Sequence, residues 1–167
     1  WQITNAFGVL MVLCDHKKMK SSGHMDVVID AAKRAAAAGE VPVAAAVIDA
    51  CGQIIVVAEN RMKRDAKSTS HAELLALEAA MSITGNSRLD GYDLWVSLEP
   101  CAMCAGAIAH ARIRRLYFAA TDQKGGAVES GVRFFDAPTC HHRPEIYGGI
   151  QAAAAQQLLT DFFAVRR

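Results

Sequence analysis

Three side chains that bind metals well stand in two short motifs. His71 is followed two positions later by Glu73, and further along the chain Pro100 precedes Cys101 and Cys104. One imidazole and two thiolates are good zinc ligands, and three protein ligands leave the fourth tetrahedral position open for water. Zinc lowers the pKa of such a water toward about 7. If Glu73 moves protons to a ring nitrogen and to departing ammonia, the pattern predicts hydrolytic deamination of an aromatic amine.

The spacing of the two cysteines alone has other interpretations. A Cys-x-x-Cys pair is also typical of a thioredoxin-like redox site, and two unrelated core cysteines can fall at this spacing. The histidine, the glutamate and the proline beside Cys101 favour catalytic zinc, and their combination is the signature of zinc-dependent nucleobase deaminases. A structural zinc would more often have a fourth cysteine or histidine nearby in sequence. Measurement of bound zinc distinguishes the redox interpretation from the zinc-binding one, since a working dithiol should be metal-free.

The elements that must position these motifs follow from apolar patterning and turn residues. Helices are predicted at residues 26–38, 71–82, 101–111 and 151–165, strands at 43–48, 54–58, 94–98 and 115–119, and loops at 60–70 and 139–149. This order predicts one α/β domain of three layers, α/β/α, around a mixed central sheet. Each motif begins a helix, and the positive end of a helix dipole favours thiolate over thiol.

Composition narrows the class of protein. The 167-residue chain is long enough for one domain with a sizeable core, and its 52% hydrophobic content argues against disorder. A formal net charge of +1 provides no general nucleic-acid coat, so any RNA contact must use local patches. No apolar run is long enough to span a membrane. Five cysteines without framework spacing indicate free thiols in a reducing cytoplasm.

The first residues look unlike the rest of the chain. The apolar run from Phe7 to Cys14 has no basic residues ahead of it and makes a poor signal peptide. The stretch from Lys17 to Met25 reads like a linker from an expression tag. We therefore expect residues 1–24 to be a leader of that origin and residues 25–167 to form a zinc-dependent deaminase domain.

A family resemblance runs from about Asp26 to the end of the chain. It is carried by Glu40-Val41-Pro42-Val43, Asn60-Arg61, His71-Ala72-Glu73, the segment from Leu98 to Ile108, Ala111-Arg112-Ile113, the segment from Asp122 to Ala127, and Asp161-Phe162-Phe163. These motifs closely resemble the bacterial tRNA-specific adenosine deaminases of the cytidine deaminase-like superfamily. The resemblance implies a homodimer with one zinc per subunit. It also implies attack of zinc-activated water on C6 of the wobble adenosine, giving inosine in an arginine-tRNA anticodon stem-loop.

The resemblance also implies substrate contacts. Asn60 matches an asparagine that hydrogen-bonds the flipped purine; the alternative is a turn residue after a strand. Asp122 matches an aspartate that approaches the anticodon-loop backbone; the alternative is a solvated loop charge. Phe163, Arg166 and Arg167 match a terminal segment against the anticodon loop, where an aromatic ring can stack on a base and arginines can meet phosphates. The alternatives are core packing for Phe162 and fraying for the arginines, and we expect one of the two phenylalanines to be buried and the other to lie near the substrate.

Several residues receive simpler interpretations. Glu99 is expected to hold its loop, and His110 to be structural. The run Cys140-His141-His142 could suggest a second metal, but adjacent residues rarely converge on one ion, and a loop bordering the substrate groove is preferred. Ala44, Ala119 and Ser70 depart from residues common in the family, and Ser70 could reshape the pocket entrance.

Two other functions remain open. A deaminase of a free nucleobase or nucleoside, such as guanine or cytosine, would use the same zinc chemistry, and the low net charge suits it. A non-catalytic RNA-binding subunit with structural zinc could dispense with the proton-shuttling acid, so Glu73 argues against it.

Overall fold

The computed structural model describes residues 2–4, 10–12 and 21–165. The helices are α1 (Ser21–Ala37), α2 (Ala72–Thr84), α3 (Ala102–His110) and α4 (Ala152–Ala164), with a 3-10 turn, η1, at Phe134–Asp136. The strands are β1 (Gln2–Thr4), β2 (Leu10–Val12), β3 (Ala44–Ile48), β4 (Ile54–Glu59), β5 (Asp93–Leu98), β6 (Arg115–Ala120) and β7 (Glu145–Tyr147).

These strands form one mixed sheet in the order β1-β2-β4-β3-β5-β6-β7. Strand β3 pairs antiparallel with both β4 and β5, whereas β5, β6 and β7 run parallel. A parallel pair needs a crossover connection, and α3 supplies it between β5 and β6. The carboxyl end of β5 therefore leads directly into the cysteine motif.

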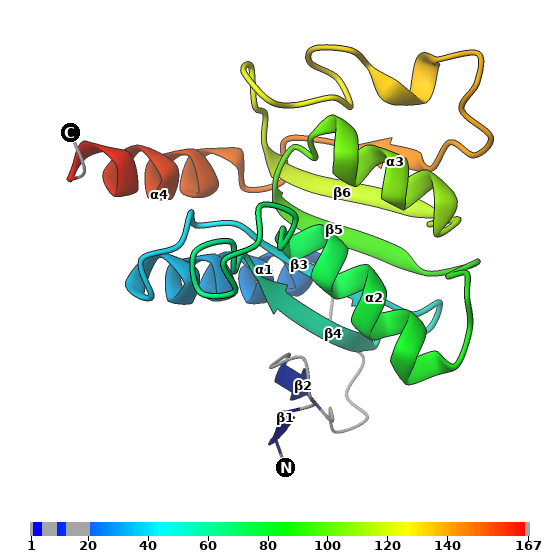
Figure 1. Cartoon of the computed structure of the whole chain (residues 1–167), viewed down its shortest axis with the longest axis horizontal. Helices are drawn as coiled ribbons and strands as arrows, with labels where there is room; N and C mark the ends of the chain where they lie inside the picture. The colour runs from blue at the N-terminus through cyan, green and yellow to red at the C-terminus, as the bar shows by residue number, and fades with distance from the viewer. Residues whose placement is uncertain (1, 5–9, 13–20, 166–167) are drawn as a thin grey trace.

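Helices cover both faces of the sheet, as the three-layer prediction required. Along β3, Val47 faces the core under α2 and α3, while its neighbour Ala46 faces the core under α1 and α4. Strand β5 repeats this alternation with Val96 and Trp95. Figure 1 shows α2 and α3 in front of the sheet and α1 behind it. The small side chains of β3 allow helices to pack closely on both sides of this central strand.

The start of α1 and the presence of β7 differ from the sequence prediction. Helix α1 begins at Ser21 rather than at residue 26, and His24 is buried, with Nε2 3.1 Å from the Gly52 carbonyl oxygen and its ring against Trp95. Strand β7 forms within the predicted loop 139–149. Its three residues have no buried face of their own, and pairing with β6 satisfies their backbone hydrogen-bonding groups. The origin of residues 1–24 stays a prediction; residues 1, 5–9 and 13–20 lie outside the described part.

Among the described residues, no helix has both the length and the apolar character needed to cross a membrane.

Candidate active site

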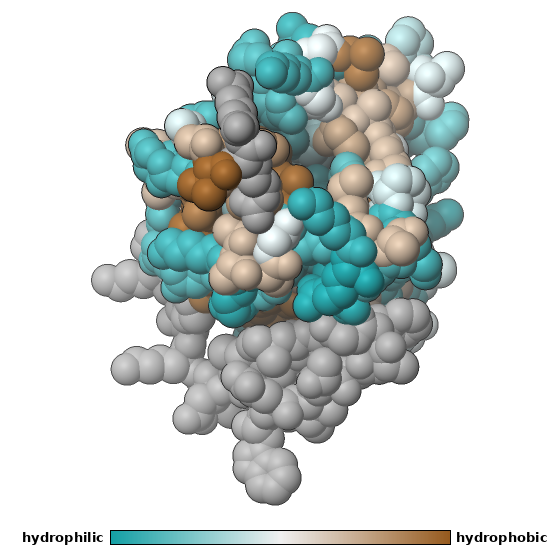
Figure 2. Space-filling model, turned by 60° about the vertical axis from the view of Figure 1, so that its left-hand side comes forward, coloured by the Kyte–Doolittle hydropathy of each residue, from teal (hydrophilic) through white to brown (hydrophobic). Residues whose placement is uncertain are grey.

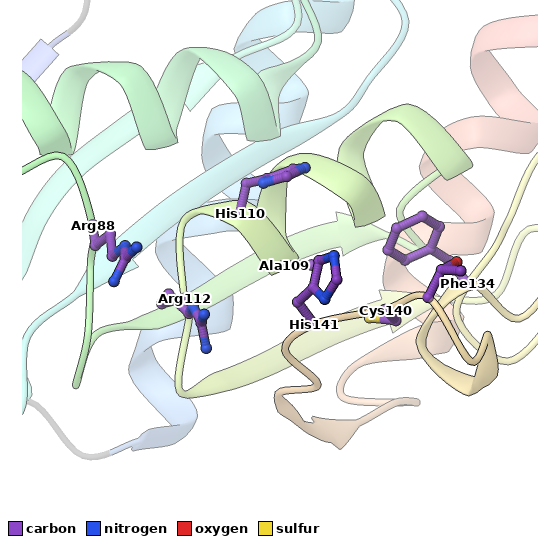
Figure 3. A pocket seen from close by; sticks show the side chains of 8 residues that line it. Arg88, Ala109, His110, Arg112, Phe134, Cys140 and His141 are labelled. Carbon is purple, nitrogen blue, oxygen red and sulfur yellow. The ribbon is translucent and has the colours of Figure 1, made fainter.

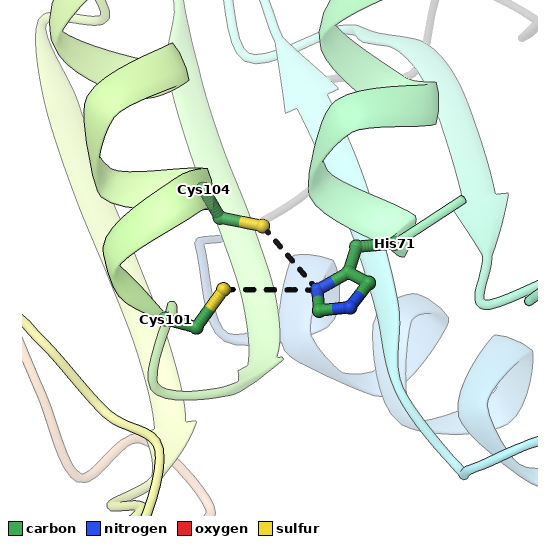
Figure 4. A group of neighbouring side chains, drawn as sticks. All are labelled: His71, Cys101 and Cys104. Carbon is green, nitrogen blue, oxygen red and sulfur yellow. Dashed lines mark hydrogen bonds between the residues drawn. The ribbon is translucent and has the colours of Figure 1, made fainter. Parts of the chain in front are cut away.

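The three predicted zinc ligands lie at the beginnings of two neighbouring helices. His71 is the N-cap of α2 and Cys101 is the N-cap of α3, both with extended backbone, and Cys104 lies in the first turn of α3. Neither N-cap side chain bonds its own helix, so both remain available for a ligand. Figure 4 shows the imidazole and the two thiols pointing toward one another across the space between the helices.

Their spacing fits a single zinc ion. The Nδ1 atom of His71 lies 3.5 Å from Cys104 Sγ and 3.8 Å from Cys101 Sγ. Ordinary zinc bonds of about 2.0 Å to nitrogen and 2.3 Å to sulfur would place these atoms about 3.6 Å apart in a tetrahedron. No other group of three metal-binding side chains converges in this way within the described residues. One zinc can therefore be held by Nδ1 of His71 and by the two sulfurs.

Hydrogen bonds within the cluster favour ionisation of one thiol. Hydrogen bonds from Cys104 and His71 lower the pKa of the Cys101 thiol to about 4. The same contact with Cys101, together with burial, raises the pKa of the Cys104 thiol, and the hydrogen bond to Cys101 raises the pKa of His71. Because a zinc ligand must be deprotonated, binding of the metal has to displace the proton that Cys104 retains.

Glu73 lies in the first turn of α2, next to these ligands. Its side chain is 3% exposed, and its Oε2 atom is buried without a hydrogen-bond partner among the described residues. Burial raises the pKa of the Glu73 carboxyl, and the nearby charge of His71 offsets that effect only in part. A buried carboxyl with one unpartnered oxygen and a raised pKa is suited to receive and release a proton near neutral pH.

Glu99 organises the loop on the other side of the cysteine motif. Its Oε1 accepts hydrogen bonds from the backbone N–H groups of Val128, Glu129 and Ser130, at 2.7–3.1 Å. Its Oε2 accepts from the Asp122 N–H and the Ser130 hydroxyl. Burial opposes ionisation, but these hydrogen bonds outweigh it and lower the pKa of Glu99. Glu99 therefore holds its loop, as the sequence predicted.

The position of Gly126 shows how closely this loop wraps the carboxylate. A Cβ atom there would collide with the Asp122 carbonyl oxygen and lie 2.6 Å from the carboxyl carbon of Glu99. Only glycine fits at this turn.

Comparisons with known proteins agree with this geometry. Residues 18–120 match the zinc-binding region of the cytidine and deoxycytidylate deaminases. A tRNA-specific adenosine deaminase from Agrobacterium fabrum is 46% identical over 86% of this chain and 93% of its own length. The chain belongs to the tRNA-specific adenosine deaminase family. It is accordingly a zinc-dependent hydrolytic deaminase, with a cytidine deaminase-like fold and a site that fits one zinc ion.

Two solved structures have a similar fold. One comes from a study of A-to-I editing by tRNA:A34 deaminases at the wobble position of transfer RNA. It superposes with a TM-score of 0.81 at 45% identity, covering 83% of this chain and 99% of the other. A guanine deaminase from Nitrosomonas europaea superposes with a TM-score of 0.76 at 27% identity, covering 87% and 85% of the two chains.

The residues that the family resemblance implies as substrate contacts differ in their burial and in their hydrogen-bond partners. Asn60 is buried directly after β4, with its amide nitrogen 3.4 Å from Glu40 Oε2. The Asp122 carboxylate accepts hydrogen bonds from the backbone N–H groups of Lys124 and Gly125, so it shapes its own turn. Their contacts with substrate stay predictions.

One of the two terminal phenylalanines is buried, as expected, and the place of the other near the substrate stays a prediction. Phe162 is buried against the fold at 7% exposure, whereas the ring of Phe163 is 48% exposed, with the two ring centroids 5.3 Å apart. Figure 2, which turns the end of α4 toward the viewer, shows small groups of hydrophobic residues among hydrophilic ones. Arg166 and Arg167 lie outside the described residues.

Within the described part of the chain, Cys140, His141 and His142 are not among the side chains that converge like metal ligands. The Nε2 atom of His142 lies 2.6 Å from the Ile113 carbonyl oxygen, and the Cys140 thiol donates to the backbone carbonyl of His142. His110 is exposed, and with His141 it lines a pocket at the C-terminal end of α3, shown in Figure 3. The sequence did not predict this pocket, because its lining comes from segments far apart in the chain.

Glu40 is a further polar residue for which the sequence predicts no role. It is 2% exposed, and its carboxylate bonds the start of the loop that leads to His71. A glutamate ahead of a strand carries no spacing signal for such a contact, so only the structure shows it.

Proposed function

We propose that this protein converts adenosine to inosine at the wobble position of a tRNA anticodon, with an arginine tRNA as substrate. The proposal rests on one observation above all. The unpartnered Oε2 of Glu73 lies beside three side chains that fit one zinc, in a chain 46% identical to a tRNA-specific adenosine deaminase.

The reaction consumes one water and releases one ammonia for each adenosine. His71, Cys101 and Cys104 would hold the zinc, which when bound supplies a Lewis acid that lowers the pKa of water at neutral pH. Glu73 takes one proton of the attacking water at its carboxylate and gives it to the purine ring nitrogen. It then takes the second proton of that water, from the hydroxyl group added to the ring carbon, and gives it to the departing amine, which leaves as ammonia. Burial of Glu73 excludes bulk water from this transfer and keeps the carboxyl able to hold the proton.

We further propose that the substrate is bound by Asn60, Asp122, Phe163, Arg166 and Arg167. Asn60 supports this role because it is buried at the base of the loop that leads to His71. Phe163 supports it because an exposed aromatic ring can stack on an unpaired base. An anticodon-loop base is already unpaired, so extruding it costs less than flipping a base from a duplex.

We propose that the protein acts as a homodimer in the cytoplasm. Exposed apolar side chains at Ile83 on α2 and Met103 on α3 provide surface that a second subunit could cover. The described cysteines outside the zinc site, Cys51 and Cys140, are free thiols, which suits a reducing compartment.

Deamination of a free base is the second candidate function. It is favoured by the similarity to the guanine deaminase from Nitrosomonas europaea, although that protein shares only 27% identity with this chain, against 46% for the adenosine deaminase. Incubation with an anticodon stem-loop and, separately, with free adenine, guanine and cytosine derivatives distinguishes the two. Inosine formed only in the RNA supports the tRNA proposal. An unchanged RNA with a deaminated free base would replace it.

A further inference from the structure

Glu40 is a buried carboxylate that the deamination chemistry does not use. It lies between the end of α1 and the start of β3 and is 2% exposed. Its Oε1 accepts from the Arg64 backbone N–H at 2.7 Å, and its Oε2 accepts from the Lys63 backbone N–H at 3.2 Å. None of the ion pairs among the described residues includes Glu40, so these N–H groups compensate its burial.

The same carboxylate contacts Asn60. The amide nitrogen of Asn60 lies 3.4 Å from Glu40 Oε2, and the Asn60 backbone N–H donates to the Val43 carbonyl. A carboxylate can only accept hydrogen bonds, so it selects the amide orientation in which nitrogen, not oxygen, faces Glu40. The orientation in turn decides which polar atoms of Asn60 remain for another partner.

Beyond Asn60 the chain forms a closed loop that ends at the zinc site. The Arg61 N–H donates to the Ser70 carbonyl at 3.0 Å and closes the base of this loop, and the His71 N–H bonds the Thr69 carbonyl at 2.7 Å. Inside the loop, the Lys67 N–H bonds the Met62 carbonyl. Glu40 thus fastens the first half of residues 61–70 to the end of α1, while His71 is held separately by its own turn and by α2.

We propose that Glu40 is a positioning residue. It fixes the Asn60 amide and the 61–70 loop, and thereby sets how tightly the substrate base is held, without taking part in metal binding. The inference rests on the proposed function of Asn60 in substrate binding.

The test is a double-mutant cycle between Glu40 and Asn60. Glu40→Gln keeps the size of the side chain but replaces one carboxylate oxygen by an NH₂ group. In either orientation of the new amide this NH₂ group faces a backbone N–H, and in one orientation it also faces the Asn60 amide nitrogen and favours rotation of that amide. We expect a KM for the anticodon stem-loop about tenfold higher, a kcat changed by less than about twofold, and zinc still at one per chain. In an Asn60→Ala background the same change should leave KM nearly unaltered, because the contact is already absent.

Glu78→Gln is the matched control. Glu78 is exposed on α2, and its substitution removes the same charge without touching the loop. An unaltered KM for Glu40→Gln, an equal KM effect in both Asn60 backgrounds, or loss of zinc from Glu40→Gln would each overturn the proposal.

A second variant and a hydrogen-exchange measurement test the proposal independently of Glu40→Gln. If Glu40→Gln does not fold, Asn60→Asp sets a second carboxylate against Glu40 and should raise KM further than Asn60→Ala; equal effects overturn the proposal. Amide hydrogen exchange on the unaltered protein needs no substrate: the Arg64 amide should exchange at least about 100-fold more slowly than that of Ser68. Fast exchange of the Arg64 amide would show that its contact with Glu40 does not form in solution and would overturn the proposal. If the Arg64 amide is protected from exchange but the protein does not deaminate the RNA, only the proposed tRNA function is rejected.

Discussion

The Nδ1 atom of His71, at the start of α2, lies 3.5 Å from the sulfur of Cys104, in the first turn of α3. The N-termini of two helices from different parts of the chain therefore lie side by side, and both contribute ligands to one potential metal site. The crossover from β5 to β6 places α3 there, and the loop after β4 places α2.

Removal of one sulfur should abolish metal binding. Cys104→Ser is expected to weaken zinc affinity by more than about 100-fold, because a hydroxyl is a poor zinc ligand and only two strong ligands remain. Metal content after dialysis, measured by elemental mass spectrometry, checks this. Cys51→Ser is the control, since Cys51 is exposed in the hairpin turn and should leave zinc at one per chain. Full zinc in Cys104→Ser would reject the ligand set.

Neutralising the proton carrier should separate chemistry from metal binding. Glu73→Gln is expected to retain zinc and to lower kcat by about 10²–10⁴-fold, because the amide cannot exchange a proton with water and substrate. Steady-state kinetics with parallel metal analysis provide the measurement. A variant with full zinc and normal kcat would show that another group moves the proton.

The carboxylate of Glu99 should contribute to stability through its loop. Glu99→Gln places an NH₂ group against backbone N–H donors and is expected to cost about 1–3 kcal/mol of unfolding free energy. Urea denaturation measures this, with Glu129→Gln as the control because the Glu129 side chain is exposed in the same loop. Equal midpoints for the two variants would contradict the role given to Glu99.

The two terminal phenylalanines should separate stability from RNA binding. Phe163→Ala is expected to weaken binding to the anticodon stem-loop by about tenfold with little change in stability, because its ring is exposed. Phe162→Ala should instead lower stability by about 3–5 kcal/mol, because it leaves a cavity. Fluorescence anisotropy and thermal unfolding on both variants check the contrast. Normal RNA affinity in Phe163→Ala would remove this residue from the interface.

An ion pair between β6 and β7 gives a pH-dependent prediction. The Arg115 guanidinium, 2.9 Å away, lowers the pKa of the Glu145 carboxyl, and the Tyr147 hydroxyl adds to this effect. The stabilisation is present above the ordinary glutamate pKa and is lost as pH falls through the lowered value. Arg115→Gln should raise the pKa of Glu145 toward its ordinary value in an NMR titration. Arg34→Gln, which disrupts a different pair, should leave it unaltered.

The parts of the fold with strong local patterns could be predicted from the sequence. The buried strand β3 and the helix starts at His71 and Cys101 follow from runs of apolar residues and from the motif itself. Strand β7 could not be predicted, because three partly exposed residues become a strand only by pairing with β6. The start of α1 could not be predicted, because its Ser-Ser-Gly-His sequence resembles a tag linker and has weak helix propensity. The contact of His24 with Trp95 holds this turn in place.

The site divides in the same way. Its three metal ligands and Glu73 carry their chemistry in residue type and spacing, so the sequence could nominate them. The supporting contact of Glu40 with Asn60 depends on two segments brought together only by folding, and a buried glutamate has no sequence signature.

Product analysis in water labelled with heavy oxygen tests the proposed reaction most directly. The purified zinc-loaded protein is incubated with an anticodon stem-loop bearing adenosine at the wobble position, and the digested nucleosides are analysed by mass spectrometry. Hydrolytic editing predicts inosine at that position alone, carrying one labelled oxygen, and formed at least about 100-fold more slowly with Glu73→Gln. Adenosine that stays unaltered in the presence of protein with one zinc per chain would contradict the proposed function.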